Sequence, residues 1–291
     1  MMPTVLEVLR KTAEFLGRKE VPSPRLEAEL LLAGALGCKR LDLYLRFDQP
    51  LTEAQLAPLR EQVARRAKRE PLQYVTGRAT FLDFTVACDR RALVPRPETE
   101  ELAELVFSRV TTPPATALDL GTGTGVLACA MARKWPESRI TAVDSSKEAL
   151  ALARANAAAL SLAERIHFAT ANWFAGMPEV EGGYDVIVSN PPYLTEAEWA
   201  EAQPEVRDWE PRGALIAGEN GLADLHRIIE GAPAHLRTGG LLVLETGPTH
   251  HAALAEMVAK IVTPDGRPAY ISTESQKDLS GRARFFLATR A

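Results

Sequence analysis

The stretch Ser189-Asn190-Pro191-Pro192-Tyr193 gathers hydrogen-bond acceptors and an aromatic ring within five residues. Proline has no backbone N–H and holds φ at about −65°, so we expect the Pro191 carbonyl to point away from any strand ladder. The side-chain amide of Asn190 adds a second oxygen, and the Tyr193 ring follows closely. Two fixed acceptors beside a flat ring suit an NH2 group on a planar π system, because they accept both hydrogens while the ring stacks on its face.

The position of this corner in the chain favours a site over a simple turn. Asn-Pro and Pro-Pro are common in turns, so the same residues alone also fit an ordinary strand-to-loop connection. However, residues 184–188 read Tyr-Asp-Val-Ile-Val, which predicts a buried strand directly before the corner. A glycine-rich loop also lies upstream, and a motif gains weight from such a structural context.

The glycine-rich loop consists of Gly121, Thr122, Gly123, Thr124 and Gly125. It follows an apolar strand at residues 116–120 and precedes a helix from Val126 to about Lys134, which predicts the first unit of a doubly wound sheet. Glycines let the backbone approach a ligand closely and tolerate positive φ. The dinucleotide-binding spacing would require glycine at position 126, where valine stands, so we do not expect the loop to cradle a phosphate.

Further polar residues follow the next two predicted strands. Residues 139–144 end in Asp144, where a carboxylate can accept from both hydroxyls of a bound ribose; the alternative is a plain cap for the helix at 146–160. The strand at 166–170 delivers Asn172 and Trp173 to the same edge, where they could flank an adenine ring. Alone, a tryptophan is more often a core residue.

The remaining pattern completes an α/β fold with seven strands. Strands are predicted at 241–245, near 269–271 and at 283–287, the last two as a hairpin through Ser280-Gly281. Residues 194–220 form a long acidic loop region of the kind that often covers a site.

The chain divides into three predicted parts. Residues 1–72 form a small helical bundle with capping boxes at Thr4 and Thr52 and, in the last helix, a kink or later start at Pro58. Residues 73–95 form a β-hairpin linker, with strands at 73–75 and 81–86. Residues 96–291 form the α/β domain.

Composition narrows the possible functions. The chain has 291 residues, 46% of them hydrophobic, and a net charge of −4, with a mildly basic front and an acidic remainder. We expect a cytoplasmic protein, because no apolar run is long enough to span a bilayer.

We expect no metal site, and we interpret the three cysteines as small buried or half-buried hydrophobes. The basic cluster at residues 65–69 is interpreted as a solvated helix end rather than a binding patch.

The order and spacing of five motifs resemble the release factor glutamine N5-methyltransferases, the PrmC/HemK family, over nearly the whole chain. Asn-Pro-Pro-Tyr is the motif by which amino-group methyltransferases that use S-adenosylmethionine are recognised. The five motifs are Pro71-x-Gln73-Tyr74, Arg96-Pro97-Glu98-Thr99-Glu100, Asp119-Leu120 with residues 121–125, Asn190-Pro191-Pro192-Tyr193, and Glu210-Pro211 with Ala214-Leu215.

The resemblance implies a Rossmann-like, class I methyltransferase fold that methylates the glutamine of the Gly-Gly-Gln loop of peptide-chain release factors. The helical N-terminal domain would help to dock the factor. The implied contacts to S-adenosylmethionine are Gly121, Thr122, Gly123, Thr124, Gly125, Asp144, Trp173 and Asn190. The implied substrate-binding residues are Asn190, Pro191, Pro192 and Tyr193, of which Asn190, Pro191 and Tyr193 are catalytic.

Two positions depart from the family pattern, and two other functions compete. Asn172 stands where many relatives carry an acid, and Ala283 replaces an acid that often follows the segment 277–282.

The main alternative function is that of an adenine- or cytosine-amino methyltransferase acting on nucleic acid. The acidic domain disfavours it, because no broad positive face is expected. The second is a non-catalytic cofactor-binding module, which the intact corner disfavours. We expect a monomer.

Overall fold

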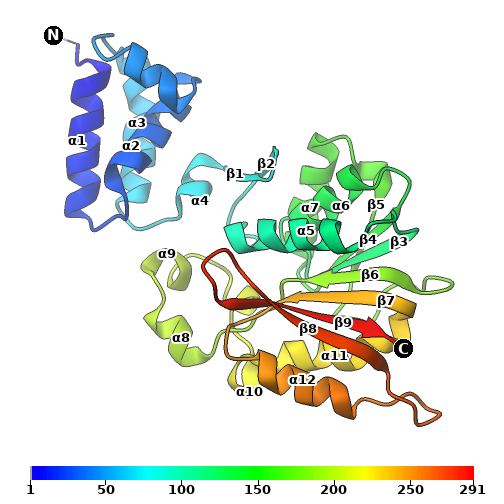
Figure 1. Cartoon of the computed structure of the whole chain (residues 1–291). Coiled ribbons are helices and arrows are strands. Elements are labelled where there is room, and N and C mark those ends of the chain that lie inside the picture. Colours follow the sequence, from blue (N-terminus) through cyan, green and yellow to red (C-terminus); the bar gives the residue numbers. More distant parts are fainter. Residues whose placement is uncertain (1) are drawn as a thin grey trace. The chain divides into compact units, whose positions relative to one another are not determined.

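The computed structural model describes residues 2–291, which divide into two compact units (Figure 1). The first unit comprises the chain up to Arg78 together with Gln203–Trp209, and the second comprises Ala79–Ala202 with Glu210–Ala291.

The first unit is a helical bundle. Its elements are α1 (Val5–Arg18), α2 (Pro24–Leu36), the 3-10 helix η1 (Arg40–Leu45), α3 (Glu53–Arg66), α4 (Leu72–Thr76) and α9 (Pro204–Arg207). The capping boxes predicted at Thr4 and Thr52 are both present. The predicted later start of the last helix is wrong, because α3 already begins at Glu53, upstream of Pro58. The buried core includes Val5, Leu16, Leu31 and Leu43.

The strand predicted at residues 73–75 is wrong, because these residues lie in the short helix α4. The amides of Tyr74 and Val75 both donate to the carbonyl of Pro71, and Gly77 ends the helix at a φ of 72°. The guanidinium of Arg65 donates to the carbonyls of Tyr74 at 3.0 Å and Val75 at 3.3 Å. This tertiary contact satisfies the last carbonyls of a helix that the β-forming side chains disfavour.

The interpretation of residues 65–69 as a solvated helix end is also wrong. Arg66 is only 2% exposed and forms ion pairs with Glu27 and, at 2.8 Å, with Glu205. Arg69 pairs with the same Glu205 at 2.6 Å, and Arg65 pairs with Glu70 at 2.6 Å. The arginines therefore bind acids of their own unit and hold the α9 segment against the helices.

The second unit contains a seven-stranded sheet of the predicted doubly wound kind, with the order β5-β4-β3-β6-β7-β9-β8. The first five strands in this order are parallel, and β9 is antiparallel to both β7 and β8. Helices α5, α6 and α7 lie on one side of the sheet, and α11 and α12 lie on the other (Figure 1). The strands are β3 (Thr116–Leu120), β4 (Arg139–Asp144), β5 (Ile166–Thr170), β6 (Tyr184–Ser189), β7 (Leu236–Glu245), β8 (Tyr270–Lys277) and β9 (Ala283–Arg290).

The helices of this unit begin with α5 at the Arg96-Pro97 motif. Residues 194–220 hold short helices rather than one irregular loop. The elements are α5 (Pro97–Arg109), α6 (Val126–Lys134), α7 (Lys147–Ala159), η2 (Ala163–Arg165), α8 (Glu196–Glu201), η3 (Arg212–Ala214), α10 (Gly218–Gly221), α11 (Ala223–His235) and α12 (His251–Lys260). In the part of the chain that is described, no helix is both long and apolar enough to cross a membrane.

A hairpin forms, but not from the predicted strands: β1 (Arg78–Phe81) and β2 (Phe84–Ala87) flank a turn at residues 82–83, which lies inside the strand predicted at 81–86. The side chain of Asn156 on α7 bonds both backbone groups of Ala87 and donates to the Thr124 carbonyl at 2.9 Å. One amide therefore ties the hairpin to the glycine-rich loop.

Candidate active site

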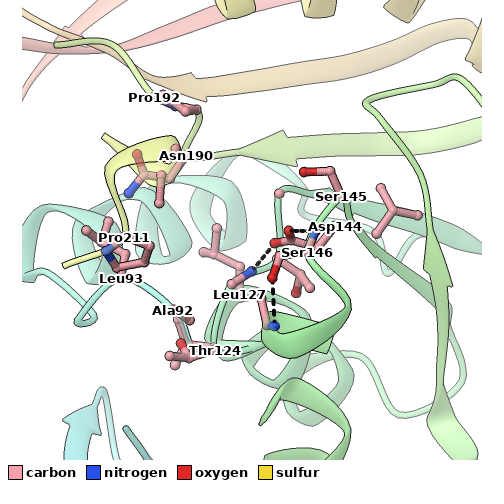
Figure 2. Close-up of a pocket in the computed structure, with 18 of the residues that line it drawn as sticks. Ala92, Leu93, Thr124, Leu127, Asp144, Ser145, Ser146, Asn190, Pro192 and Pro211 are labelled. Carbon is pink, nitrogen blue, oxygen red and sulfur yellow. Dashed lines mark hydrogen bonds between the residues drawn. The ribbon is translucent and has the colours of Figure 1, made fainter. Parts of the chain in front are cut away.

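The predicted site residues meet at the carboxyl edge of the parallel strands. A cavity of about 310 Å³ there is lined by Gly121–Thr124, Asp144, Trp173, Asn190 and Pro192. Asn190 and Pro192 lie on one side of it, and Asp144 and Ser146 lie on the other (Figure 2). Gly125, Pro191 and Tyr193 are not among the lining residues. The structure thus gathers most of the predicted cofactor residues in one place.

The glycine-rich loop turns sharply between β3 and α6. Gly121, Gly123 and Gly125 have φ values of 71°, 55° and 85°, which side chains rarely adopt. A Cβ on Gly125 would also lie 3.0 Å from the Cβ of Ala153, closer than ordinary contact. The loop therefore needs glycine both for its backbone and for its packing on α7.

Asp144 lies at the end of β4 and holds the loop. Its carboxylate accepts hydrogen bonds from the amides of Gly123 and Ser146, both at 2.9 Å. Asp144 and Ser146 are labelled in Figure 2. Burial raises the pKa of Asp144, although these amide hydrogen bonds act to lower it. Ser146 itself caps α7 by accepting from the Ala149 amide at 3.1 Å. A carboxylate has about four acceptor positions, so Asp144 retains capacity for a further donor.

Trp173 lines the cavity with its ring. A Cβ on Gly121 would lie 3.4 Å from that ring, and the indole Nε1 donates to Asp224 at 3.0 Å. Because its polar atom is engaged, the indole offers an apolar face. Asn172, whose role the sequence left open, also lines the cavity and is exposed. Asp224 lines the cavity too, and no sequence motif pointed to it.

The corner after β6 is held at both ends. The Ser189 hydroxyl donates to the Leu120 carbonyl at 2.7 Å, which fixes β6 beside β3. The Asn190 Nδ2 donates to the Thr99 hydroxyl at 2.9 Å, so its Oδ1 is left to accept. Across residues 2–291, no donor of the chain reaches the carbonyl of the buried Pro191.

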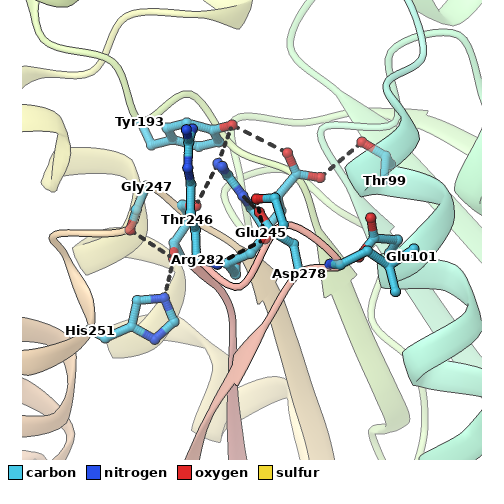
Figure 3. Close-up of polar contacts among 12 residues, drawn as sticks. Thr99, Glu101, Tyr193, Glu245, Thr246, Gly247, His251, Asp278 and Arg282 are labelled. Carbon is cyan, nitrogen blue, oxygen red and sulfur yellow. Dashed lines mark hydrogen bonds and ion pairs between the residues drawn. The ribbon is translucent and has the colours of Figure 1, made fainter.

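A buried polar cluster lies behind the corner, and Figure 3 shows Thr99, Glu245 and Tyr193 joined within it. Thr99 donates to Glu245 Oε2 at 2.8 Å, and Tyr193 donates to Glu245 Oε1 at 3.3 Å. Arg284 donates to the Tyr193 oxygen at 3.3 Å and to Asp278 at 3.2 Å. Burial raises the pKa of Glu245 to about 7, against the hydrogen bond from Thr99 and the charge of Arg284.

Comparison with known proteins identifies the family. Residues 7–77 match the PrmC N-terminal domain, and residues 99–203 match the Methyltransferase small domain. The Release factor glutamine methyltransferase of Deinococcus radiodurans is 40% identical over 288 residues, covering 98% of both chains. That of Rhodopirellula baltica is 36% identical over 293 residues, covering 99% of this chain and 97% of its own. The chain belongs to the release factor glutamine methyltransferase family.

Other relatives agree with this assignment. The Release factor glutamine methyltransferase of Geobacter sulfurreducens is 44% identical over 250 residues, covering 84% of each chain. Among solved structures, the hMettl16 catalytic domain in complex with a 3′UTR hairpin superposes with a TM-score of 0.55 and 14% identity, covering 81% of this chain and 82% of its own. At that identity the similarity supports the methyltransferase fold alone.

Two motifs of this methyltransferase meet in an ion pair beside the cavity. Arg96 donates to Glu210, whose side chain is fully buried. Burial raises the pKa of Glu210 to about 7, while the charge of Arg96 acts to lower it. Arg96 and Pro211 both line the cavity, so the pair fixes the segment that begins at Glu210 against its wall.

Gly221 is a site residue that sequence reasoning missed. Its φ is 86°, and a Cβ there would lie 2.3 Å from the Tyr193 carbonyl oxygen. We expect Gly221→Ala to displace the Asn-Pro-Pro-Tyr corner and to lower kcat about 10-fold or more, since small misplacements at a reacting centre are costly. Gly266→Ala is the matched control: its φ is 80°, but nothing lies within 4 Å of the added Cβ. Steady-state kinetics showing equal losses in both variants would contradict the steric account.

The buried Asp119 is expected to make the free energy of unfolding depend on pH. It is fully buried, accepts from Thr122 at 2.6 Å and from the Ala128 amide at 3.1 Å, and burial raises its pKa from 3.8 to about 7. Between pH 3.8 and about 7, the Asp119 carboxyl is protonated in the folded state and ionised in the unfolded state. Unfolding therefore releases a proton, and rising pH favours the unfolded state. We expect Asp119→Asn to gain stability relative to the wild type from about pH 4 to about pH 7, by roughly 1 kcal/mol or more. A difference in unfolding free energy that stays constant across denaturant titrations in this range would refute this.

Proposed function

We propose that this methyltransferase transfers a methyl group from S-adenosylmethionine to the side-chain amide nitrogen (N5) of the glutamine in the Gly-Gly-Gln loop of peptide-chain release factors. The names of its relatives support the reaction and the substrate class. The observation that carries the site assignment is the Asn190 amide, which gives its NH2 to Thr99 and keeps its oxygen for a ligand. Beside it, the Pro191 carbonyl supplies a second acceptor for the two hydrogens of a primary amide.

The lining of the cavity offers groups that suit the polar and aromatic parts of S-adenosylmethionine. We propose that the Asp144 carboxylate accepts from the ribose hydroxyls, that Trp173 lies against the adenine, and that the backbone of Gly121–Gly125 closely approaches the nucleoside. The remaining acceptor capacity of Asp144 and the apolar face of Trp173 support these roles. When bound, the cofactor supplies an electrophilic methyl carbon on a positively charged sulfur.

The chain must make a poor nucleophile reactive. An amide nitrogen shares its lone pair with the carbonyl, and the rotation barrier of about 18–20 kcal/mol measures that conjugation. As the nitrogen gains positive charge, its hydrogens become more acidic, so Asn190 and the Pro191 carbonyl bind the transition state more tightly than the ground state. Tyr193 confines the amide plane. The corner also sets the line of attack, which contributes through orientation. No general base is needed, because the product proton leaves readily to water.

We assign the other parts of the chain accordingly. Residues 1–72 dock the release factor, residues 73–95 link the domains, and residues 96–291 carry out the transfer. The enzyme acts as a cytoplasmic monomer and forms no stable complex with nucleic acid or membrane. The net charge of −4 supports the absence of a broad nucleic-acid-binding face.

Incubation with a purified release factor and S-adenosylmethionine tests the substrate. Peptide mass spectrometry should show one added methyl group on the loop glutamine and on no other residue. A gel shift and a methyl-transfer assay with duplex DNA and RNA at physiological salt should both be negative. Transfer to nucleic acid without transfer to the factor would replace this proposal with an amino-group methyltransferase of nucleic acid.

A further inference from the structure

A chain of hydrogen bonds links the cavity to a buried carboxylate. Asn190 Nδ2 donates to Thr99 Oγ1 at 2.9 Å, and Thr99 Oγ1 donates to Glu245 Oε2 at 2.8 Å. The three residues come from the end of β6, the first turn of α5 and the end of β7. Thr99 is 4% exposed and Glu245 is 1% exposed, so water does not compete for these bonds. Of the three, Asn190 and Thr99 line the cavity, and Glu245 lies behind them.

The donor and acceptor roles in these two hydrogen bonds are fixed by the number of hydrogens available. An ionised carboxylate only accepts, and a threonine hydroxyl carries a single hydrogen. Once Thr99 has donated that hydrogen to Glu245, its oxygen can only accept from Asn190. Rotating the Asn190 amide by half a turn would set its oxygen against the Thr99 oxygen, with no hydrogen between them. The NH2 of Asn190 therefore faces Thr99, and its oxygen faces the ligand.

We propose that Thr99 and Glu245 are positioning residues that orient the Asn190 amide, so that the active site accepts an N–H group and rejects an acceptor at the same place. The inference rests on the proposed function, since it concerns how the same corner recognises its substrate. This orientation explains why the site selects a glutamine carboxamide over the equally sized carboxylate of glutamate. A carboxylate oxygen would face the Asn190 oxygen with no hydrogen between them. Neither Thr99 nor Glu245 touches the reacting atoms.

Protonation of Glu245 would weaken this orientation, because a neutral carboxyl group has a hydrogen that it can donate to Thr99. The charged and titratable groups that act on Glu245 are Glu98 on α5, Tyr193 after β6 and Arg284 on β9. Burial raises the pKa of Glu245 to about 7. We therefore expect kcat to rise with pH through about 7. Glu245→Gln places a group that does not titrate at this position, so its pH profile should lose this rise.

Paired substitutions at Thr99 test the proposal. Thr99→Val removes the hydroxyl at nearly constant volume, and Thr99→Ser restores it. The matched control is Thr116→Val, because Thr116 is a buried threonine at the amino-terminal end of β3 whose hydroxyl also donates within the protein, to the Gly183 carbonyl at 3.0 Å. Thr99→Val should lower kcat at least about 10-fold with the affinity for S-adenosylmethionine nearly unchanged, whereas Thr99→Ser and Thr116→Val should keep kcat within about twofold. Melting temperatures of all three variants separate this effect from unfolding.

The outcomes distinguish this proposal from the proposed function. Wild-type turnover of the release factor reports on the function alone. Hydrogen exchange of the Asn190 side-chain NH2, measured by NMR without substrate, reports on the orientation alone. It should be slow in the wild type, Thr99→Ser and Thr116→Val, and several-fold faster in Thr99→Val. Equal exchange in both valine variants, equal kcat in both, or an unchanged pH rise in Glu245→Gln would each overturn the proposal.

Discussion

Asn190→Ala is expected to lower kcat on the order of 10²-fold or more while the affinity for S-adenosylmethionine stays within a few-fold of the wild type. The Asn190 oxygen is the acceptor that the side chain leaves free after its NH2 donates to Thr99. Its removal takes away an interaction that strengthens as the substrate nitrogen becomes charged, so the loss falls on kcat. Steady-state kinetics with a release factor and calorimetry with the cofactor measure the two quantities separately.

A second variant strengthens this test. Asn190→Gln retains the carboxamide but displaces it by one methylene, so we expect a loss similar to that of Asn190→Ala if placement matters. An Asn190→Ala enzyme that retained turnover would remove Asn190 from the mechanism. A loss confined to cofactor affinity would make it a cofactor ligand instead.

Asp144→Ala is expected to act first on cofactor affinity, weakening it about 10²-fold. Two hydrogen bonds from ribose hydroxyls to a charged acceptor contribute roughly 3 kcal/mol together, which corresponds to that factor. Asp144→Asn should be milder, because the asparagine keeps one carbonyl oxygen as an acceptor. Isothermal titration calorimetry gives the dissociation constants, and circular dichroism checks the loop, since Asp144 also binds the Gly123 and Ser146 amides. Unchanged cofactor affinity in Asp144→Ala would exclude the ribose role.

The sheet and the edge that carries the site could be predicted from the sequence. Parallel strands buried on both faces read as continuous apolar runs, as in the fully buried β3 and β6. In a doubly wound sheet the carboxyl ends of such strands share one edge, so Asp144 and Asn190 had to come near each other. The glycines at 121, 123 and 125 were informative because the turn requires positive φ at all three positions.

The polar contacts that hold the site could not be predicted in the same way. Thr99 binds Glu245 across 146 positions, and Arg66 binds Glu205 across 139. No local pattern encodes such partners. The motif that contains Thr99 did not point to Glu245, and Arg66 looked like part of a solvated helix end. The short helix α4 was missed for a related reason, since Arg65 caps it from outside its own sequence. Tertiary hydrogen bonds of this kind override local propensity.

The most direct test of the central claim is a crystal structure of the enzyme with S-adenosylhomocysteine and a peptide that contains the Gly-Gly-Gln loop. We expect the glutamine NH2 to lie within hydrogen-bonding distance of both the Asn190 oxygen and the Pro191 carbonyl, with its nitrogen facing the sulfur. A glutamine amide that sits away from these two oxygens, or a corner turned away from the sulfur, would contradict that claim.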